Sequence, residues 1–545
     1  MVHHAANLGT SNHLAVLVER KLGVLISLAF LLFSSCTLLV AQYTNIRISS
    51  PSNRDPEEVT IAINPKNPLN LIAGANLRYY YSSADGGLTW IQRQLPTRTW
   101  GDPSVIFDAD GRAYYGHLSD WRNTLGGDWI DRLTIHRSSD GGQTWFDSVT
   151  VGHNPPKHQD KEWLAADMTN SLYKNTLYMA WTEFDTYGSS KSTDSTRILF
   201  SRSTDGGTSW STPFKISDRG GDCIDSDNTV EGAVPAVGPN GEVYVAWAGP
   251  RGLEFDKSTD GGKTFGNDVA VTSMPGGWDF NVSGIYRCNG LPVTACDASN
   301  SPYRGSIYIN WSDQRNGANN TDIFLVKSTD GGTTWGTVKK VNDDNTTDHQ
   351  FFTWMTVDQS NGYLYLVFYD RRNYADSTTD VYCARSTDGG GSFTNFKVSQ
   401  TSFLPRPNIF FGDYTNIAAM NGKVYPIWMR LDGTSLSVWT ALIDETPSAV
   451  SPSASSVPSE YELAQNFPNP FNPSTTIRVV LPRSGRAHLA VFDALGRTVA
   501  TLLDGELPAG IHHVRFYADN LPGGVYYYRL QAKTFTESKK LILLK

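Results

Sequence analysis

Short runs of apolar, β-branched and aromatic residues recur along most of the chain and are separated by glycine-rich turns. The runs 243–247, 307–311 and 364–368 read Val-Tyr-Val-Ala-Trp, Ile-Tyr-Ile-Asn-Trp and Leu-Tyr-Leu-Val-Phe. Such residue types favour strands, and their short length with frequent turn residues is typical of all-β proteins. The pattern therefore predicts an all-β fold.

One motif follows these runs six times. The segment 203–210 reads Ser-Thr-Asp-Gly-Gly-Thr-Ser-Trp. Related segments occupy 83–90, 139–145, 258–265, 328–335 and 386–393. Asp-Gly-Gly between two strands indicates a hairpin turn, because glycine adopts positive φ without strain. An aspartate there can accept hydrogen bonds from the amides of its own turn. We therefore interpret these aspartates as structural.

The motif resembles the Asp-box, or bacterial neuraminidase repeat, of the sialidase-like β-propellers, and the resemblance covers about residues 43–443. It implies a ring of four-stranded sheets, or blades. In that family the box joins the third and fourth strands of a blade, on the face opposite the active site.

Counting units predicts how the ring closes. Seven segments open like a first strand, but the seventh unit, 413–442, has no box. Residues 43–49, Tyr-Thr-Asn-Ile-Arg-Ile-Ser, resemble 393–399, which follow the last box. We therefore predict a seven-bladed β-propeller whose N-terminal strand completes the last blade, which removes exposed strand edges. A six-bladed sialidase-like ring is the second choice.

The two ends of the chain differ from the repeats. Residues 1–41 combine Arg20 and Lys21 with an apolar stretch and a small residue before Gln42, as a secretory signal peptide does. An uncleaved membrane anchor is the alternative reading. After the propeller (42–443), the Pro/Ser-rich segment 444–460 reads as a linker.

Residues 461–545 begin with a segment that contains Asn-Phe-Pro-Asn-Pro-Phe-Asn-Pro and continue with alternating strands. They resemble the C-terminal sorting domain of the type IX secretion system, a small β-sandwich; an ordinary Ig-like binding module is the alternative. The resemblance implies a secreted or cell-surface protein that is a partner of the type IX machinery, with no membrane span once the signal is removed.

Composition narrows the possible partners. The net charge is -8 and no long basic run occurs, which argues against nucleic acid. Four cysteines follow the signal segment, and Cys288 and Cys296 are close enough to close a short loop. Their spacing fits no zinc pattern. The acidic run 222–227 lacks the glycine turn of a calcium loop, so we expect no metal and no cofactor.

Candidate chemistry lies where first strands begin and second strands end, because these positions ring the mouth of the channel opposite the boxes. They are rich in ionisable residues, and converging arginines suit a ligand that carries an oxyanion. Sialidases use a tyrosine nucleophile assisted by Glu, an Asp acid/base and three arginines. The resemblance places catalytic candidates at Asp102, Asp160, Glu231 and Tyr414. The substrate-binding candidates are Arg287, Arg315, Arg371, Arg372, Glu162, Trp163, His349 and Asp413.

Three functions fit this pattern. The first is a sialidase-like glycoside hydrolase acting on acidic glycans, which requires Tyr near Glu and three converging arginines. The second is a lyase or hydrolase for uronate-bearing polysaccharide, for which a His–Tyr pair near one arginine would be typical. The third is a non-catalytic carbohydrate- or protein-binding propeller, whose mouth charges would all be paired without a cavity.

Overall fold

The computed structural model describes residues 43–50, 56–97, 99–119, 130–446, 460–466, 469–507, 510–518 and 521–544. The predicted signal peptide and most of the predicted linker lie outside these ranges. Over the described residues the secondary structure consists of strands and turns without helices, so no membrane-crossing helix occurs there. The chain divides into two compact units between residues 446 and 447.

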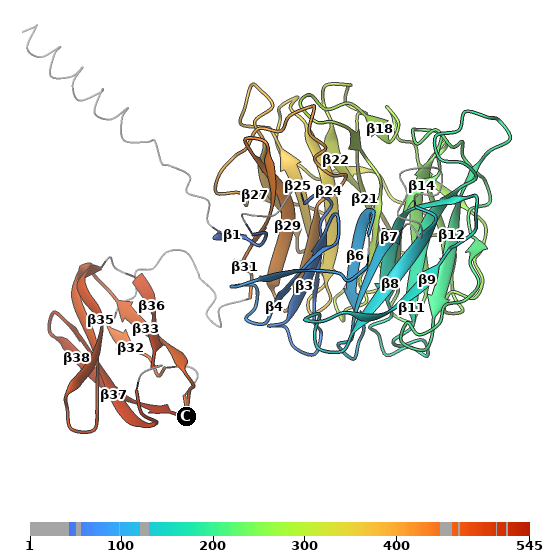
Figure 1. Cartoon of the computed structure of the whole chain (residues 1–545). Helices are drawn as coiled ribbons and strands as arrows, with labels where there is room; N and C mark the ends of the chain where they lie inside the picture. The colour runs from blue at the N-terminus through green and yellow to red at the C-terminus, as the bar shows by residue number, and fades with distance from the viewer. Residues whose placement is uncertain are drawn as a thin grey trace, which may run out of the picture. The chain divides into compact units, whose positions relative to one another are not determined.

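The first unit is built from successive antiparallel sheets of four or five strands, seven in the described part of the chain (Figure 1). Their first strands are β2 (Thr60–Ile63), β6 (Gly101–Phe107), β10 (His158–Ala166), β14 (Glu231–Val237), β20 (Val293–Cys296), β24 (Gln350–Asp358) and β28 (Asn416–Met420). The second strands are β3 (Leu71–Ala75), β7 (Ala113–Ser119), β11 (Leu177–Phe184), β15 (Val243–Gly249), β21 (Ile307–Asp313), β25 (Tyr363–Asp370) and β29 (Lys423–Asp432).

Each sheet continues outward through a third and a fourth strand. The third strands are β4 (Tyr79–Ser83), β8 (Arg132–Ser138), β12 (Thr196–Ser203), β16 (Gly252–Ser258), β22 (Asp322–Ser328), β26 (Asp380–Ser386) and β30 (Ser435–Ala441). The fourth strands are β5 (Ile91–Gln94), β9 (Phe146–Val151), β13 (Phe214–Lys215), β17 (Val269–Thr272), β23 (Lys339–Lys340), β27 (Thr394–Lys397) and, in the last sheet, β1 (Asn45–Arg47).

The sheets form a closed ring. Each first strand contacts the first strand of the next sheet, and β28 of the last sheet contacts β2 of the first. The last sheet joins both ends of the unit, because Asn45 pairs with Ala441 and Arg47 with Trp439. A short strand, β31 (Ile443–Asp444), also pairs with β29 in that sheet. The prediction of an all-β propeller is confirmed, and the N-terminal strand lies in the last sheet as the sequence predicted.

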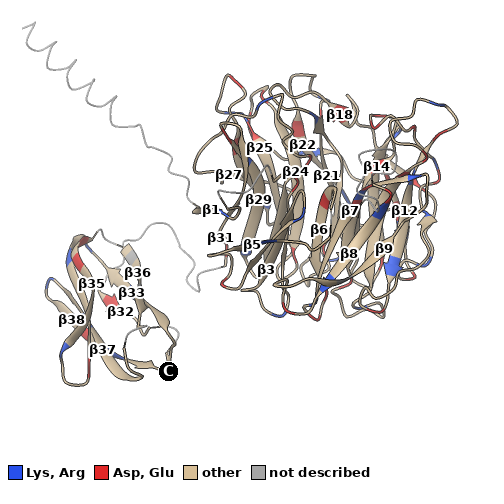
Figure 2. Cartoon of the chain, viewed as in Figure 1, with Lys and Arg blue, Asp and Glu red and all other residues tan. Residues whose placement is uncertain are grey.

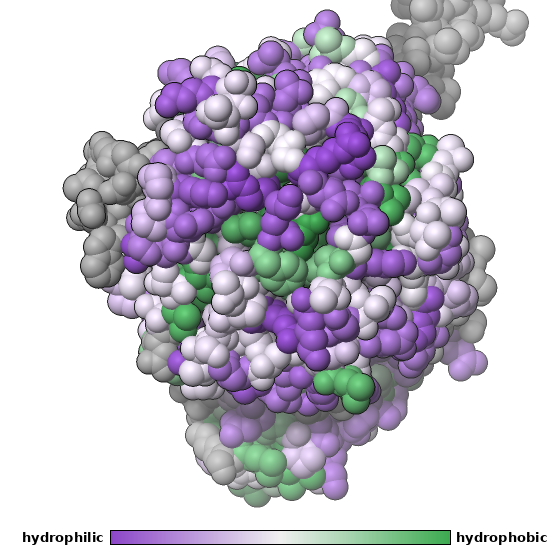
Figure 3. Space-filling model, turned by 90° about the vertical axis from the view of Figure 1, so that its right-hand side faces the viewer, coloured by the Kyte–Doolittle hydropathy of each residue, from purple (hydrophilic) through white to green (hydrophobic). Residues whose placement is uncertain are grey.

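The core repeats from sheet to sheet. Trp181, Trp247, Trp311 and Trp428 each occupy an equivalent position in a second strand, and each is at most 1% exposed. The second strands β11, β15 and β21 are buried along their whole length. The uniformly apolar runs of the sequence are therefore the strands that neighbouring sheets cover on both faces. Lys, Arg, Asp and Glu residues lie mainly in loops and near strand ends of the ribbon (Figure 2). The face shown in Figure 3 is largely hydrophilic, with apolar side chains in small groups.

The Asp-Gly-Gly turns are held by one repeated set of hydrogen bonds. In the turn after β12, Asp205 accepts bonds from the Ser209 amide at 2.9 Å, the Ser209 hydroxyl at 2.5 Å and the Ser203 hydroxyl at 2.8 Å. Both glycines have positive φ, 70° at Gly206 and 78° at Gly207. The other five turns have the same arrangement, as at Asp85 and Asp330. These contacts agree with a structural role for the aspartates.

The four cysteines that follow the signal segment, Cys223, Cys288, Cys296 and Cys383, are all buried and all free. The short loop that a bond between Cys288 and Cys296 would close is therefore not cross-linked. Burial raises the pKa of each thiol, which disfavours the reactive thiolate.

The second unit contains two sheets. Their strands are β32 (Glu462–Leu463), β33 (Ser474–Leu481) and β36 (Gly510–Tyr517) in one, and β35 (Thr498–Leu507), β34 (Gly485–Phe492), β37 (Gly524–Ala532) and β38 (Phe535–Leu543) in the other. One core contains Ile477 and Phe516 from the first sheet together with Leu489, Tyr528 and Leu541 from the second. Two sheets around one apolar core make a β-sandwich.

Removing one turn aspartate tests its structural role. We expect Asp205→Ala to lower the free energy of unfolding by roughly 1–2 kcal/mol, because the Ser209 and Ser203 donors lose their acceptor. Urea unfolding followed by tryptophan fluorescence measures the loss. Asp205→Asn, which keeps one acceptor oxygen, should lie between wild type and alanine. An unchanged midpoint in both variants would contradict the assignment.

Two histidines form a buried pair between β7 and β8. The Nε2 atoms of His117 and His136 lie 3.1 Å apart, and His136 also contacts the Thr97 hydroxyl at 2.8 Å. Burial lowers the pKa of His117 to about 3 and that of His136 to about 4, and the neighbouring His136 further lowers the pKa of His117. Both rings therefore stay neutral in the folded protein at neutral pH.

This pair makes stability depend on pH. The folded pKa values lie below the unfolded value of about 6.5, so below that pH the unfolded chain binds more protons. We expect the stability from the neutral pair to be complete above pH 6.5 and to fall as the pH drops toward 4. Urea midpoints across this range should change less in His117→Gln/His136→Gln than in wild type. The half-exposed His153→Gln is the control and should keep the wild-type dependence.

Candidate functional site

A β-bulge recurs where first strands begin, at the end of each sheet opposite the Asp-Gly-Gly turns. The register shifts between Gly101 and Ser104, between Asp160 and Trp163, between Glu231 and Val234, and between Phe351 and Trp354. The first bulged residues are Asp102, Lys161, Gly232 and Phe352, with φ of 51°, 51°, 75° and 49°. Positive φ is uncommon for residues other than glycine and is often found at functional sites. These bulges place several different side chains around the mouth.

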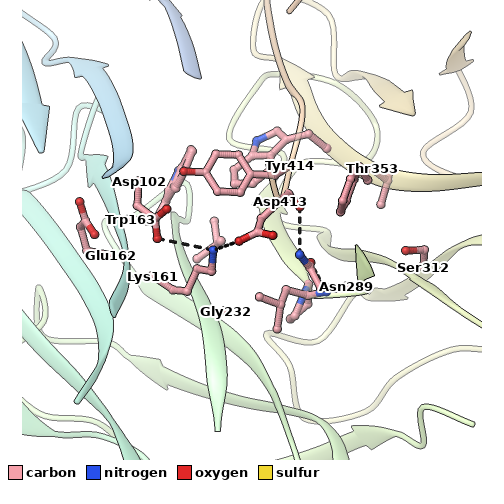
Figure 4. Close-up of a pocket in the computed structure, with 15 residues that line it drawn as sticks. Asp102, Lys161, Glu162, Trp163, Gly232, Asn289, Ser312, Thr353, Asp413 and Tyr414 are labelled. Carbon is pink, nitrogen blue, oxygen red and sulfur yellow. Dashed lines mark hydrogen bonds and ion pairs between the residues drawn. The ribbon is translucent and has the colours of Figure 1, made fainter. Parts of the chain in front are cut away.

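The bulged positions line a cavity of about 520 Å³ (Figure 4), which we call cavity 1. One wall is aromatic: the ring centroids of Trp163 and Trp354 are 4.2 Å apart, and Tyr414 lies 5.7 Å from Trp163. Asp102, Lys161 and Glu162 also line the cavity. An aromatic surface beside hydrogen-bonding groups is a common arrangement for binding a ring-shaped polar ligand.

Lys161 bridges two aspartates from distant parts of the chain. Its Nζ lies 2.6 Å from Asp413 Oδ2 and 3.5 Å from Asp102 Oδ2, as the dashed lines in Figure 4 show. Arg287 also binds Asp413, with Nε 2.8 Å from Oδ1 and Nη2 on Oδ2. Burial by itself would raise the pKa of Asp413, but Lys161 and Arg287 outweigh it and hold that pKa well below its usual range. Asp413 is therefore ionised and forms ion pairs with both Lys161 and Arg287.

The loop between β17 and β20 brings Arg287 to this site. It contains the hairpin of β18 (Asp279–Phe280) and β19 (Cys288–Asn289). Asn289 donates to the backbone carbonyl of Asp413 at 3.0 Å, which fixes the loop before β28 against this hairpin. The ion pair of Asp413 with Arg287 thus joins elements that are far apart in sequence.

Two carboxyl groups of cavity 1 differ in their surroundings. Glu162 is 1% exposed, and neither oxygen has a hydrogen-bond partner among the described residues. Burial and then the negative charge of Asp102 raise the pKa of Glu162 well above its usual value, so its protonated form is favoured. Asp102 instead faces the ammonium of Lys161. The cavity therefore combines a neutral carboxylic acid with an ion-paired carboxylate.

Tyr414 points toward Asp102 in Figure 4, and its hydroxyl has no hydrogen-bond partner in the described part of the chain. Burial and the charge of Asp102 raise its pKa, which disfavours the phenolate. The Lys161 ammonium lies 5.5 Å from its ring centroid. Tyr414 is thus a neutral aromatic wall with a free hydroxyl.

A second cavity of about 380 Å³, cavity 2, adjoins the first. Both are lined by Lys161, Asn289, Leu291 and Asp413. Cavity 2 adds Asp160, Tyr187, Asp225, Glu231, Trp278, Asp279, Arg287 and Cys288. Burial, followed by neighbouring carboxylates, raises the pKa of Asp160 and of Glu231 well above the usual range.

Three of the four predicted arginines do not reach either cavity. Arg315 binds Asp313 at 2.6 Å and lies over Phe324. Arg371 donates to the Ser283 carbonyl at 2.6 Å. Arg372 binds Asp370 at 2.7 Å. These three arginines therefore do not form the arginine triad expected from the sequence, because Arg315 and Arg372 bind carboxylates of their own loops and Arg371 binds a carbonyl of a distant segment.

His349 also lies away from the cavities and contacts the Thr321 hydroxyl at 2.9 Å, so the structure does not pair it with Tyr414. The other predicted site residues come together. Asp102, Glu162, Trp163 and Tyr414 line cavity 1, Asp160, Glu231 and Arg287 line cavity 2, and Asp413 lines both.

Several residues of the site were not among the predicted ones. Lys161, Trp354 and Asn289 line cavity 1, and Tyr187 and Asp225 line cavity 2. Lys161 lies between two predicted residues, Asp160 and Glu162. Its position at the start of a first strand was the sequence feature that could have identified it as a site residue. Tyr187 and Asp225 lie in loops that no repeat position marks. Among the described residues no group of three or more metal-binding side chains is arranged to hold a metal ion.

Comparisons with known sequences identify two regions. Residues 175–409 match a family model described as a BNR repeat-like domain, and residues 465–544 match one described as a secretion system C-terminal sorting domain. The chain therefore contains both a sialidase-like repeat region and a sorting domain. No curated protein sequence matches the chain.

Solved structures that are similar to this chain include an ulvan lyase from a new family of polysaccharide lyases. It has 12% sequence identity and a TM-score of 0.44, with 74% of this chain and 96% of the lyase covered. The NanB sialidase of Streptococcus pneumoniae has 9% identity and a TM-score of 0.42, with 69% and 83% covered. Trypanosoma rangeli sialidase has 13% identity and a TM-score of 0.40, with 92% and 89% covered.

Removing the central cation tests the charge network. We expect Lys161→Met to lower the free energy of unfolding by roughly 3–5 kcal/mol, because it leaves buried carboxylates with less compensation. The double variant Lys161→Met/Asp413→Asn should lose less than the sum of the single losses, as chemical denaturation would measure. The exposed Lys66→Met should be close to neutral. Additive losses in the double variant would mean that the two groups are not coupled.

Proposed function

We propose that the propeller is a secreted or cell-surface glycoside hydrolase whose reaction takes place in cavity 1. The observation that carries this proposal is the pair of carboxyl groups Glu162 and Asp102, one favoured in its protonated form and the other held beside a lysine. Glycoside hydrolysis typically uses one carboxylic acid and one carboxylate, and unequal surroundings assign the two roles. The C-terminal sorting domain supports the location outside the cell.

Each residue of cavity 1 has a role in this proposal. Glu162 donates its proton to the oxygen of the leaving sugar. Asp102, which lies beside the Lys161 ammonium, either attacks the anomeric carbon or activates water. Trp163, Trp354 and Tyr414 provide an aromatic surface for stacking of the sugar ring.

The charge network keeps the carboxylate pair unequal. Lys161 lies beside Asp102, and Asp413 fixes Lys161 in place. Asp102 in turn raises the pKa of Glu162. Lys161 and Asp413 are therefore positioning residues for the two carboxyl groups.

The alternatives require features that these cavities lack. A tyrosine nucleophile would need a base that accepts its proton and three arginines for the substrate carboxylate, whereas Arg315, Arg371 and Arg372 bind other partners. A lyase with a His–Tyr pair would need His349 near Tyr414, but His349 does not line cavity 1. A binding propeller with every mouth charge paired would not leave Glu162 without a partner.

Substitution of the two carboxyl groups tests the proposal. The purified protein is incubated with a panel of aryl glycosides and polysaccharides, and released reducing ends are measured. We expect Glu162→Gln and Asp102→Asn each to reduce kcat by about 10²–10⁴-fold on any substrate that wild type cleaves. Activity of wild type should also decline at high pH, when Glu162 loses its proton.

A matched control is Glu242→Gln. Glu242 lies in the turn between β14 and β15, at the end of the sheet away from the mouth, and accepts hydrogen bonds from Asn240. It should keep full activity. Full activity in Glu162→Gln and Asp102→Asn, with melting temperatures unchanged, would contradict the assignment. Binding of glycans without any cleavage by wild type would instead favour a binding propeller.

A further inference from the structure

Cavity 2 is lined by more carboxyl groups than basic groups. Its carboxyl groups are Asp160, Asp225, Glu231, Asp279 and Asp413, and its cations are Lys161 and Arg287. Both cations bind Asp413 directly. Arg287 Nη1 is 3.9 Å from Asp225, and no other cation lines the cavity. Four carboxyl groups therefore share almost no positive charge of their own.

Glu231 is the most deeply buried carboxyl group of cavity 2. Glu231 is 1% exposed, and no N–H or O–H donor of the described residues reaches its carboxyl oxygens. Its neighbours are other carboxyl groups, Asp225 and Asp160, and only its protonated form can hydrogen-bond to Asp225. A buried carboxyl group without a donor is costly, so such a group calls for a ligand that donates hydrogen bonds.

The other walls of cavity 2 narrow the chemistry of that ligand. The described carboxyl groups are not arranged to hold a metal ion. Tyr187 donates its hydroxyl to Asp225, which orients that carboxylate, and the buried Trp278 presents an aromatic side chain. Carboxylates beside an aromatic ring suit an organic ammonium group, which donates three hydrogen bonds and is attracted to a ring face.

We propose that cavity 2 is a subsite for the ammonium group of an amino sugar, with Glu231 and Asp225 as its acceptors. This inference rests on the proposed function, because it names the substrate class of the same site. The two cavities share Lys161 and Asp413, so a glycan held in cavity 1 reaches cavity 2 with an adjacent group. The preferred substrate is then a glycan with free amines, which is positively charged. The sequence had instead predicted an acidic glycan, which is negatively charged.

Binding by the full chain tests the subsite. Isothermal titration at pH 6.5 compares a β-1,4-linked glucosamine tetramer with its fully N-acetylated counterpart, which has the same backbone but no charge. We expect wild type to bind the glucosamine tetramer at least about tenfold more tightly, equivalent to about 1.4 kcal/mol. Asp225→Asn and Glu231→Gln should each remove most of this preference, while Glu242→Gln should keep it.

Equal affinity for the two tetramers, or a preference that both cavity 2 variants retain, would overturn the subsite. Asp225→Asn distinguishes loss of binding from loss of folding, because Asp225 is half-buried and asparagine keeps the shape of the side chain. The thermal melt of this variant is recorded to confirm that it folds. Hydrolysis is read separately from binding. An amine preference without cleavage would refute the hydrolase and leave the subsite intact. Cleavage of glycans without amine preference would refute the subsite alone.

Discussion

Pairing of β1 with β30 is the constraint on which the first unit depends. It joins the described N-terminal segment to the last sheet through the pairs Asn45–Ala441 and Arg47–Trp439. A ring of sheets is stable only when every sheet has neighbours on both sides, since an open ring would expose two apolar faces and a strand edge. Closure also brings Asp413, from the start of the last sheet, next to Lys161 and Arg287.

The mouth of the ring depends on a local irregularity that the repeat provides. Bulges at the starts of first strands place Asp102, Lys161, Gly232 and Phe352 at equivalent points of four sheets. A bulge redirects the side chain without disturbing the rest of the strand. The same backbone feature can therefore present an acid, a base, an empty position or an aromatic ring. Function resides in the side chains at these points, and stability resides in the rest of the repeat.

Charge in the site is organised around one buried anion. Asp413 is 2% exposed and holds Lys161 and Arg287, and Lys161 in turn faces Asp102. Because Lys161 and Arg287 both bind Asp413, no N–H or O–H donor in the described part of the protein reaches Glu162 or Glu231. Buried acids of this kind are costly to the fold, and sites of binding or catalysis are where such cost is retained.

The sequence by itself determined the all-β class, the turns at Asp205 and its equivalents, and the N-terminal strand in the last sheet, because these follow from local residue patterns repeated along the chain. It also placed Asp102, Glu162, Trp163 and Tyr414 at the mouth. Only the tertiary structure decided which charges are available. Arg315 and Arg372 bind aspartates two residues away, whereas Arg287 crosses to Asp413, 126 residues further along the chain. Such partners depend on distances across the ring, which no local pattern encodes.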